Sequence, residues 1–484
     1  MTPSVTSATN GPHPLPTEAA SDLHARLTFD LDVDLCVVGA GLAGLSVALE
    51  AAQLGLSVAV LEARRVGWAA SSATLGSVLP GYGVPIGELI ERVGVGHASD
   101  LWALSREGMD IVRARATEEA MPGIALSSGA LEVSNVDLGD RLVERLQTLG
   151  VDFGSEVEGW QIDRVREVLR TQRYFHAIHF PGAFQLDGRR YIRGLEAMAR
   201  RAGVRIFEDT PVLGIDSSGI RKRIVTPHAR MRASDIVLAG NVHLGAASPR
   251  LTRTLLPMWR MAALTAPLGE RLAEAIAFTG SIADTDGVDH YRIVGGDRLL
   301  WTGPETTFDI APRRLEGLIR RRIAALYPQL GAVAIERSWS APIGQTVHGM
   351  PQIGELRRGL WVASGFGRHG LSTTAIAGRL IAQGIVHGDQ RWRLFDPFEL
   401  VWAGGKIGRV VGQGVAIAER RTAIASGLLA RYRERAAERS RQREERREAA
   451  NRSVRRVLPE QTPASPTKSD RPVEQRTEAG SPSA

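Results

Sequence analysis

The stretch LDVDLCVVGAGLAG, residues 31–44, decides how the N-terminal part of the chain folds. Residues 35–38 are an apolar run of strand length, and the apolar residues after Gly44 recur at the spacing of a helix. A strand, a glycine turn and a helix in this order aim backbone N–H groups and the positive end of the helix dipole at an anion. The stretch therefore predicts a site for a phosphate group.

Each glycine of this turn has a physical reason to be glycine. Gly39 allows the tight turn, Gly41 lets the backbone approach a pyrophosphate, and Gly44 lets the helix pack closely on the strand. A second apolar strand, residues 58–61, leads to Glu62, which lies 18 residues past Gly44, where a carboxylate can accept a hydrogen bond from a ribose hydroxyl. An ordinary βαβ unit does not require all of these features together, so the pattern predicts a dinucleotide site.

The length and composition of the chain indicate a globular protein with two domains. The 484 residues exceed one ordinary hydrophobic core, and 43% of them are apolar and 23% charged. No uninterrupted apolar run is long enough to span a bilayer, and residues 1–29 lack the pattern of a signal peptide, so we expect a flexible leader there. The single cysteine, Cys36, excludes an internal disulfide and favours a reducing, cytoplasmic location.

The positive charge of the chain is concentrated near its C-terminal end. Residues 404–456 contain 15 Lys or Arg and 6 Asp or Glu, which gives +9, whereas the whole chain carries +7. The rest is therefore nearly neutral, at −2, and nothing in it requires a nucleic acid as a partner. We expect a basic helical extension at residues 396–435, able to make weak contact with a membrane surface or a protein, and a disordered tail at residues 436–484.

The periodicity of the remaining chain predicts an α/β protein in which two kinds of segment are interleaved. Helices are expected at residues 86–120, 138–150, 162–170, 191–203 and 312–326, and strands at residues 204–208, 259–267, 289–302 and 333–345. A strand at residues 360–364 leads through a second glycine loop, residues 365–370, into a helical run at residues 371–384. A second helix N-terminus is therefore aimed at something electron-rich.

These two glycine loops resemble those of the D-amino-acid oxidase-like family of FAD-dependent oxidoreductases, which includes glycine oxidase, sarcosine oxidase and gamma-glutamylputrescine oxidase. The resemblance covers about residues 30–435 and includes the PQIG element at residues 351–354. The FDPF and WAGG elements at residues 395–398 and 402–405 look most like the gamma-glutamylputrescine oxidase branch.

The resemblance implies a Rossmann-like FAD-binding domain interleaved with an antiparallel-sheet α+β substrate domain. On this basis, residues 30–85, 186–245 and 346–395 form the FAD-binding domain, and residues 86–185 and 246–345 form the substrate domain. FAD would be held noncovalently, with its pyrophosphate at the first glycine turn and its isoalloxazine at the second glycine loop. The implied cofactor-binding residues are Gly39, Gly41, Leu42, Ala43, Gly44, Glu62, Ala63, Ser71, Val212, Gly240, Gly365, Gly367, Gly370 and Leu371.

The chain departs from the family pattern at two places. Members of this branch carry WGASGRNGG where this chain has WAASSATLG, residues 68–76, so Ala73 and Thr74 replace an arginine and an asparagine. In glycine oxidase, an arginine that binds the substrate carboxylate lies eleven residues before the glycine of the PxIG element, which corresponds to Ile343 here. Because an apolar residue cannot pair with a carboxylate, we expect a substrate other than a simple α-amino acid.

Four residues are candidates for substrate contact or catalysis. Tyr291 and Arg292 lie on a predicted strand of the substrate domain, and Arg368 and His369 lie in the second glycine loop. Tyr291 could equally be a half-buried strand tyrosine, and each arginine could be an ordinary surface cation. The position in the glycine loop favours Arg368 and His369. The histidines are scattered without the spacing of ligands, so no metal site is expected.

The predicted function is oxidation of a C–N bond in an amine substrate, such as a polyamine derivative, by hydride transfer to flavin N5. The second glycine loop, residues 365–370, also has GxGxxG spacing, but the resemblance assigns it to the same flavin. The sequence therefore predicts no separate NADPH site, which leaves oxygen or another electron acceptor to reoxidise the flavin. One alternative is oxidation of a secondary or D-amino acid. Another is a flavin-binding protein without turnover of its own, which the altered residues 72–75 allow.

Overall fold

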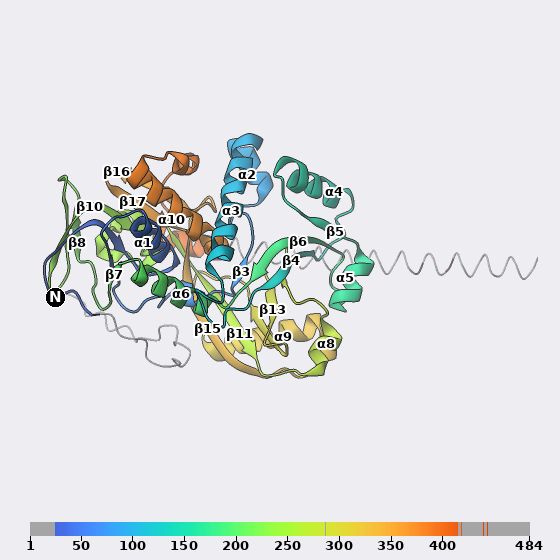
Figure 1. The fold of residues 1–484 in the computed structure, drawn as a ribbon. Helices are drawn as coiled ribbons and strands as arrows, with labels where there is room; N and C mark the ends of the chain where they lie inside the picture. Colours follow the sequence, from blue (N-terminus) through green and yellow to red (C-terminus); the bar gives the residue numbers. More distant parts are fainter. Residues whose placement is uncertain (1–24, 286, 415–417, 419–438, 440–442, 444–484) are drawn as a thin grey trace, which may run out of the picture. The chain divides into compact units, whose positions relative to one another are not determined.

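A computed structural model of the protein describes residues 25–285 and 287–414 together with Ala418, Arg439 and Arg443. Residues 1–427 form one compact unit, and residues 428–484 belong to a second. Figure 1 shows that the first unit contains two sheets with helices around them. Most of the predicted leader, the end of the predicted basic extension and nearly all of the predicted tail lie outside the described residues.

The first sheet has eight strands and is parallel at its centre. Its main path runs β16-β17-β10-β1-β2-β7, and the β8–β9 hairpin continues from β10. The strands are β1 (Leu31–Val38), β2 (Val58–Leu61), β7 (Arg205–Phe207), β8 (Gly214–Asp216), β9 (Lys222–Val225), β10 (Arg230–Leu238), β16 (Gln352–Arg357) and β17 (Leu360–Ser364).

The second half of strand β1, residues 35–38, is apolar without alternation because both of its faces are covered. Leu35 and Val37 belong to the core beneath the helices, whereas Cys36 and Val38 belong to a separate core on the opposite face. A parallel strand buried on both sides is expected to read as a continuous apolar run. Cys36 is thus a buried core residue, and burial raises the pKa of its thiol to about 12.

Helices on one face of this sheet position the two glycine loops. They are α1 (Leu42–Gln53), α3 (Val95–Arg115), α6 (Gly188–Arg201) and α10 (Gly370–His387), and they share one core with the sheet. α1 packs directly on α10, and α10 packs on α3. The short helix α2 (Ile86–Val93) precedes α3, and α4 (Asp140–Gln147) follows the first strands of the second sheet (Figure 1).

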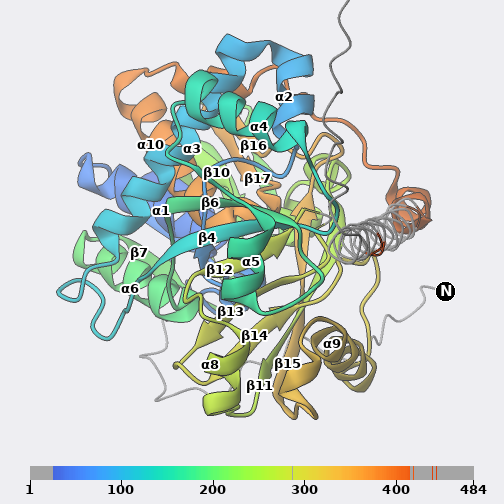
Figure 2. The same cartoon turned by 90° about the vertical axis from the view of Figure 1, so that its right-hand side faces the viewer.

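The second sheet has nine strands and lies beside the helices of the first sheet. Its order is β15-β11-β14-β13-β12-β4-β6-β3, with β5 paired to β6. The strands are β3 (Ser77–Val78), β4 (Ser127–Ser134), β5 (Glu158–Trp160), β6 (His176–Gln185), β11 (Leu256–Thr265), β12 (Ser281–Asp284), β13 (His290–Val294), β14 (Arg298–Thr302) and β15 (Ile335–Gln345). One face packs on α5 (Ile162–Leu169), α8 (Glu270–Ala275) and α9 (Pro312–Leu326), as Figure 2 shows.

The two sheets follow the predicted division of the chain with exceptions. The first sheet uses segments predicted to bind FAD, and the second uses segments predicted to bind substrate, apart from β3. In addition, α3 lies in a predicted substrate segment but packs in the core of the first sheet. The assignment of the segments to two domains stays a prediction. None of the helices in the described residues combines the length and apolar character needed to cross a bilayer.

A cluster of buried tyrosines lies in the core of the second sheet. The Tyr291 hydroxyl lies 2.7 Å from the Tyr327 hydroxyl and donates to the Tyr174 hydroxyl at 3.3 Å. The Tyr291 ring stacks on Trp301, with the ring centroids 4.1 Å apart. Because all of these rings are buried, each hydroxyl depends on the others for its hydrogen bonds.

Replacing Tyr291 with phenylalanine should therefore destabilise the protein without removing its activity. The free energy of unfolding in urea is expected to fall by about 1–3 kcal/mol, because two buried hydroxyls lose a partner. Flavin content and the rate of flavin reduction by substrate should stay as in the wild type. Unchanged stability with lost flavin reduction would instead assign Tyr291 to the reaction.

Candidate functional site

The first glycine turn brings β1, β10 and α1 so close together that two of its positions have no room for a side chain. Gly39 has φ +108°, and a Cβ there would lie 3.0 Å from backbone atoms of Ala239 and Gly240. A Cβ at Gly44 would lie 1.9 Å from the Gly39 carbonyl oxygen. The turn therefore leaves bare backbone facing outward at the N-terminus of α1.

Glu62, directly after β2, holds the turn from its other side. Its carboxylate accepts hydrogen bonds from the backbone N–H of Ala40 at 2.8 Å and of Arg64 at 2.9 Å. Burial raises the pKa of Glu62, while these two N–H donors oppose the shift. The carboxylate thus lies beside the turn. Its separation from the glycines in the sequence is also typical of an acid that binds a ribose hydroxyl.

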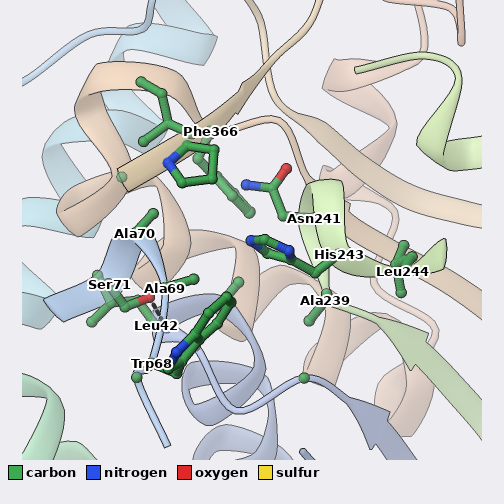
Figure 3. Close-up of a pocket in the computed structure, with 18 of the residues that line it drawn as sticks. Leu42, Trp68, Ala69, Ala70, Ser71, Ala239, Asn241, His243, Leu244 and Phe366 are labelled. Atoms are coloured by element: carbon green, nitrogen blue, oxygen red, sulfur yellow. Dashed lines mark hydrogen bonds between the residues drawn. The ribbon is translucent and has the colours of Figure 1, made fainter. Parts of the chain in front are cut away.

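Ser71 caps the first helix from a separate loop. It lies in a short 3-10 helix at Ala70–Ala73, and its Oγ accepts from the backbone N–H of Leu42 at 3.0 Å (Figure 3). The altered residues of this loop have their own contacts: Thr74 Oγ1 accepts from Gly76 N at 3.2 Å, and the Ala73 carbonyl accepts from Trp339 Nε1 at 3.4 Å. The loop is therefore packed against β15 of the second sheet.

The second glycine loop joins β17 to α10 and turns the helix N-terminus toward the same place. Gly365 and Gly367 have φ of +71° and +58°. Thr373 and Thr374 in the first turn of α10 donate to the carbonyls of His369 and Gly370. The first turn of α10 is thus braced by its own hydroxyls, next to the cavity that it faces.

One cavity of about 410 Å³ connects the two glycine turns with the second sheet. Most of the predicted cofactor-binding residues line it, and Figure 3 shows part of this lining. Those that do so are Gly39, Gly41, Leu42, Ala43, Glu62, Ala63, Ser71, Val212, Gly240, Gly367, Gly370 and Leu371. Gly44 lies beneath Gly39 instead, and Gly365 packs against Thr346, so both shape the turns without facing the cavity.

The four candidates for substrate contact are divided by the structure. Arg368 lines the cavity, and His369 is its partly buried neighbour, whose ring is hydrogen-bonded to the backbone of Leu79. Tyr291 lies in the tyrosine cluster on the far face of its strand, so the structure does not place it at the cavity. Arg292 points to the opposite face of β13 but donates to the Leu186 carbonyl at 3.1 Å and does not line the cavity either.

A charged cluster that the sequence did not reveal lies at the second-sheet end of the cavity. Arg260 of β11 lines the cavity, and its Nε lies 3.9 Å from Glu305 Oε1. Arg368 donates to the same carboxylate oxygen at 3.0 Å, so two guanidinium groups share one carboxylate. Strand alternation explains the position of Arg260, because Met261 and Ala263 face the core beneath the sheet.

Two neutral histidines complete this cluster. His290 Nδ1 lies 3.5 Å from Arg260 Nη2, and its Nε2 lies 3.1 Å from Ser77 Oγ. Burial lowers the pKa of His290 well below its usual value, and burial with Arg368 and Arg260 lowers the pKa of His369 to about 4. Burial also lowers the pKa of Arg260. The two histidines therefore stay neutral near neutral pH, and the cations that line the cavity here are Arg260 and Arg368.

Three further residues that line the cavity were not identified from the sequence. Trp68 and His243 meet edge to face, with ring centroids 5.2 Å apart, and Asn241 lies beside them (Figure 3). Asn241 has φ +51°, which is rare for a residue other than glycine. The sequence offers no local pattern for these three residues, since they come from loops whose contacts are made across the chain. In the described part of the chain, no group of acidic, histidine or cysteine side chains could hold a metal ion.

Two glycine turns that face one cavity, with a second sheet across it, are the features of a flavin-dependent oxidoreductase. Residues 34–384 match the DAO family, which is described as FAD dependent oxidoreductase. Since this match spans more than half of the chain, the protein belongs to the DAO family of FAD-dependent oxidoreductases.

Similarity to individual proteins supports this assignment. The chain is similar to a probable oxidoreductase OrdL of Haemophilus influenzae, at 29% identity over 75% of this chain and 85% of that protein. It is similar to the gamma-glutamylputrescine oxidoreductase of Escherichia coli, at 27% identity over 77% of this chain and 87% of that protein. The crystal structure of glycine oxidase from Geobacillus kaustophilus has the same fold, with TM-score 0.63, 24% identity, and coverage of 77% of this chain and 99% of that one. The predicted fold class is thus confirmed.

The cofactor of this family is FAD, and the lining of the cavity fits it. The bare backbone at Gly39 and Gly41 and the N-terminus of α1 suit a pyrophosphate, and Glu62 suits a ribose. The N-terminus of α10 supplies partial positive charge at the other glycine loop, where the resemblance places the isoalloxazine. The roles of the individual residues stay predictions.

Replacing Gly39 with alanine should reduce flavin binding roughly tenfold or more, because the new methyl group meets the backbone of β10 and displaces the turn. Gly55→Ala is a matched control: Gly55 has φ +92° and open space around it, so it shares the backbone strain but not the site. The ratio of flavin to protein absorbance measures the effect. Equal flavin loss in both variants would contradict the assignment.

The lowered pKa values of the partly buried His290 and His369 lead us to expect a loss of stability in mild acid. Below the unfolded pKa of about 6.5, the unfolded chain takes up protons on His290 and His369. In the native protein the pKa of both histidines is lower, so His369 stays neutral down to about pH 4. The free energy of unfolding should therefore fall as the pH falls through this window. In thermal unfolding, His290→Gln should lose less stability than the wild type between about pH 7 and pH 5, and the exposed His228→Gln should match the wild type.

Proposed function

We propose that this protein oxidises a C–N bond of an amine that also carries an anionic group, using FAD. The observation that supports this proposal is the cluster of Arg260, Glu305 and Arg368 at the second-sheet end of the cavity. Arg260 and Arg368 both line the cavity, so two guanidinium groups are available to a bound substrate there. A substrate carboxylate would accept charge-assisted hydrogen bonds from them.

The two guanidinium groups that line the cavity also favour the reactive form of an amine. Hydride loss from the carbon next to nitrogen requires a neutral amine with a free lone pair. Of the described residues that line the cavity, Glu62 is the only carboxylate, and it lies at the first glycine turn. An ammonium ion near Arg260 and Arg368 would be repelled, so its pKa would fall and the neutral amine would be favoured.

Bound FAD would supply the hydride acceptor, and the residues of this chain would supply position and a dry pocket. Phe366 and Ile343, which are both buried, line the cavity and exclude water. His369 is neutral at physiological pH, so it adds no further charge beside the amine. We also propose that the flavin is held noncovalently, because burial keeps Cys36, the only cysteine, protonated and inaccessible. The lone reduced cysteine favours a cytoplasmic location.

The substrate class that best fits is a polyamine derivative with a carboxylate at some distance from the amine. One relative is named for gamma-glutamylputrescine, and a gamma-glutamyl group carries such a carboxylate. A secondary or D-amino acid is the second candidate, since Arg260 can pair with its carboxylate. Arg260 and Ile343 lie on neighbouring strands and line the same cavity, so a guanidinium is available although residue 343 is apolar.

Anaerobic titration of the flavoprotein tests this proposal. Its flavin absorbance should be bleached by carboxylate-bearing amines, with gamma-glutamylputrescine, sarcosine and D-alanine distinguishing the two candidate classes. Bleaching by amines that lack an anionic group, at equal concentration, would contradict the role of the cluster. If flavin is bound but no amine bleaches it, the alternative of a flavin-binding protein without turnover of its own is favoured. The altered residues Ala73 and Thr74 allow this alternative. Reoxidation of the bleached flavin by air would identify oxygen as an acceptor.

Replacing Arg260 with glutamine should weaken the binding of the effective substrate roughly 10- to 100-fold, because a charge-assisted hydrogen bond is lost. The uncharged amide of the same substrate should lose less than about threefold. Arg298→Gln is the control, because Arg298 pairs with Glu336 on the second sheet and does not line the cavity. The substrate concentration for half-maximal bleaching measures both variants. An equal loss for substrate and amide would argue that Arg260 only supports the fold.

A further inference from the structure

A helix at residues 405–414 attaches to the rest of the protein through its smallest residues. A Cβ at Gly412 would lie 3.1 Å from Leu256 Cδ2 of β11, so this face packs closely. Thr307 fixes the same face: its backbone N–H donates to Gln413 Oε1 at 2.8 Å, and its hydroxyl donates to the Arg409 carbonyl at 2.9 Å. The orientation of this helix on the protein is therefore set by contacts on one side.

The opposite face of this helix presents apolar side chains to solvent. Ile407 is 72% exposed, Val410 is 64% exposed and Val411 is 58% exposed. Their spacing of three and four residues places them on one stripe, away from Gly408 and Gly412. A soluble helix normally turns such a stripe toward the core. Here Gly412 faces the protein and the branched side chains face outward.

Neighbouring residues extend this apolar surface. Trp402, just before the helix, is 63% exposed, and Phe308, next to the anchoring Thr307, is 49% exposed. Leu400 and Val401 are also exposed. We call the set of Phe308, Leu400, Val401, Trp402, Ile407, Val410 and Val411 the apolar strip. Clustered exposed apolar residues of this kind mark an interaction surface.

Positive charge accompanies the apolar strip. Lys406 and Arg409 are exposed on the same helix, and residues 404–456 carry +9 in the sequence. We propose that the apolar strip docks on an anionic lipid surface, with its apolar side chains in the headgroup boundary and the cations at the phosphates. Trp402 suits this position, since an indole is apolar with one polar N–H.

A second copy of the chain fits this surface less well. In a twofold dimer the same patch meets itself, so Lys406 and Arg409 of one copy would lie near those of the other. Like charges brought together in this way oppose association. An anionic surface instead neutralises every one of them.

The proposed contact lies close in the chain to the charged cluster of the cavity. Thr307, which anchors the helix, is two residues from Glu305, and Thr306 pairs with Trp259, the neighbour of Arg260. Docking at the apolar strip would therefore place the second-sheet end of the cavity near the lipid surface.

Vesicle flotation of the full-length flavoprotein tests this proposal. The wild type should float with phosphatidylglycerol–phosphatidylcholine vesicles and much less with phosphatidylcholine alone, and added salt should release it. The triple variant Ile407→Ser, Val410→Ser, Val411→Ser should have an affinity for anionic vesicles that is lower by roughly tenfold or more. A control with Val143→Ser, Val151→Ser and Ile220→Ser, which are 53%, 81% and 92% exposed elsewhere, should bind like the wild type.

Three results would overturn the proposal. The first is a wild type that floats equally poorly with both kinds of vesicle. The second is a triple variant that keeps its binding while its flavin content and melting temperature match the wild type. The third is a concentration-dependent dimer, seen by gel filtration, that only the triple variant abolishes, because this would assign the apolar strip to a second copy of the chain.

Discussion

The parallel arrangement of β1, β10 and β17 is the constraint on which the site depends. β10 pairs in parallel with β1 on one side and with β17 on the other, so the carboxyl ends of β1 and β17 meet at one edge of the sheet. Each of them leads through a glycine turn into a helix, and the N-termini of α1 and α10 consequently face one cavity. The packing of α1 on α10 fixes this convergence, because neither helix can shift without the other. Two sets of orphan N–H groups are thus available to one extended, anionic ligand.

The opposite wall of the cavity has a different electrostatic character. The first sheet contributes helix ends and the Glu62 carboxylate, whereas the second sheet contributes Arg260 in an otherwise apolar surface. Glu305 joins Arg260 to Arg368 and so links the second sheet to the loop before α10. The neutral His290 and His369 add polarity without charge. The position of a bound amine would therefore be set by charge at one end and by the flavin at the other.

Local patterns in the sequence predicted the fold well, but they could not predict the charged cluster. The turn at residues 39–44, the strand at residues 360–364 and the helix at residues 312–326 follow from periodicity and glycine, which act between near neighbours in the chain. Arg260, Glu305 and Arg368 are brought together by pairing between distant strands, which a single sequence does not specify. Tyr291 shows another limit: its position on a predicted strand allowed a role in the site or in the core equally, and only the structure shows that strand alternation turns it into the core.

The departures from the family pattern can be related to the places where this chain does carry guanidinium groups at the cavity. Ala73 and Ile343 lack the guanidinium groups that the resemblance leads one to expect, and both residues line the cavity. Arg260 faces the same cavity from β11, paired with Ala341 two residues from Ile343, and Arg368 enters from the loop before α10. Positive charge is thus present, but it comes from other strands and lies beside Glu305. A carboxylate held there would sit at a different place relative to the flavin, which favours a substrate whose anionic group is remote from its reacting C–N bond.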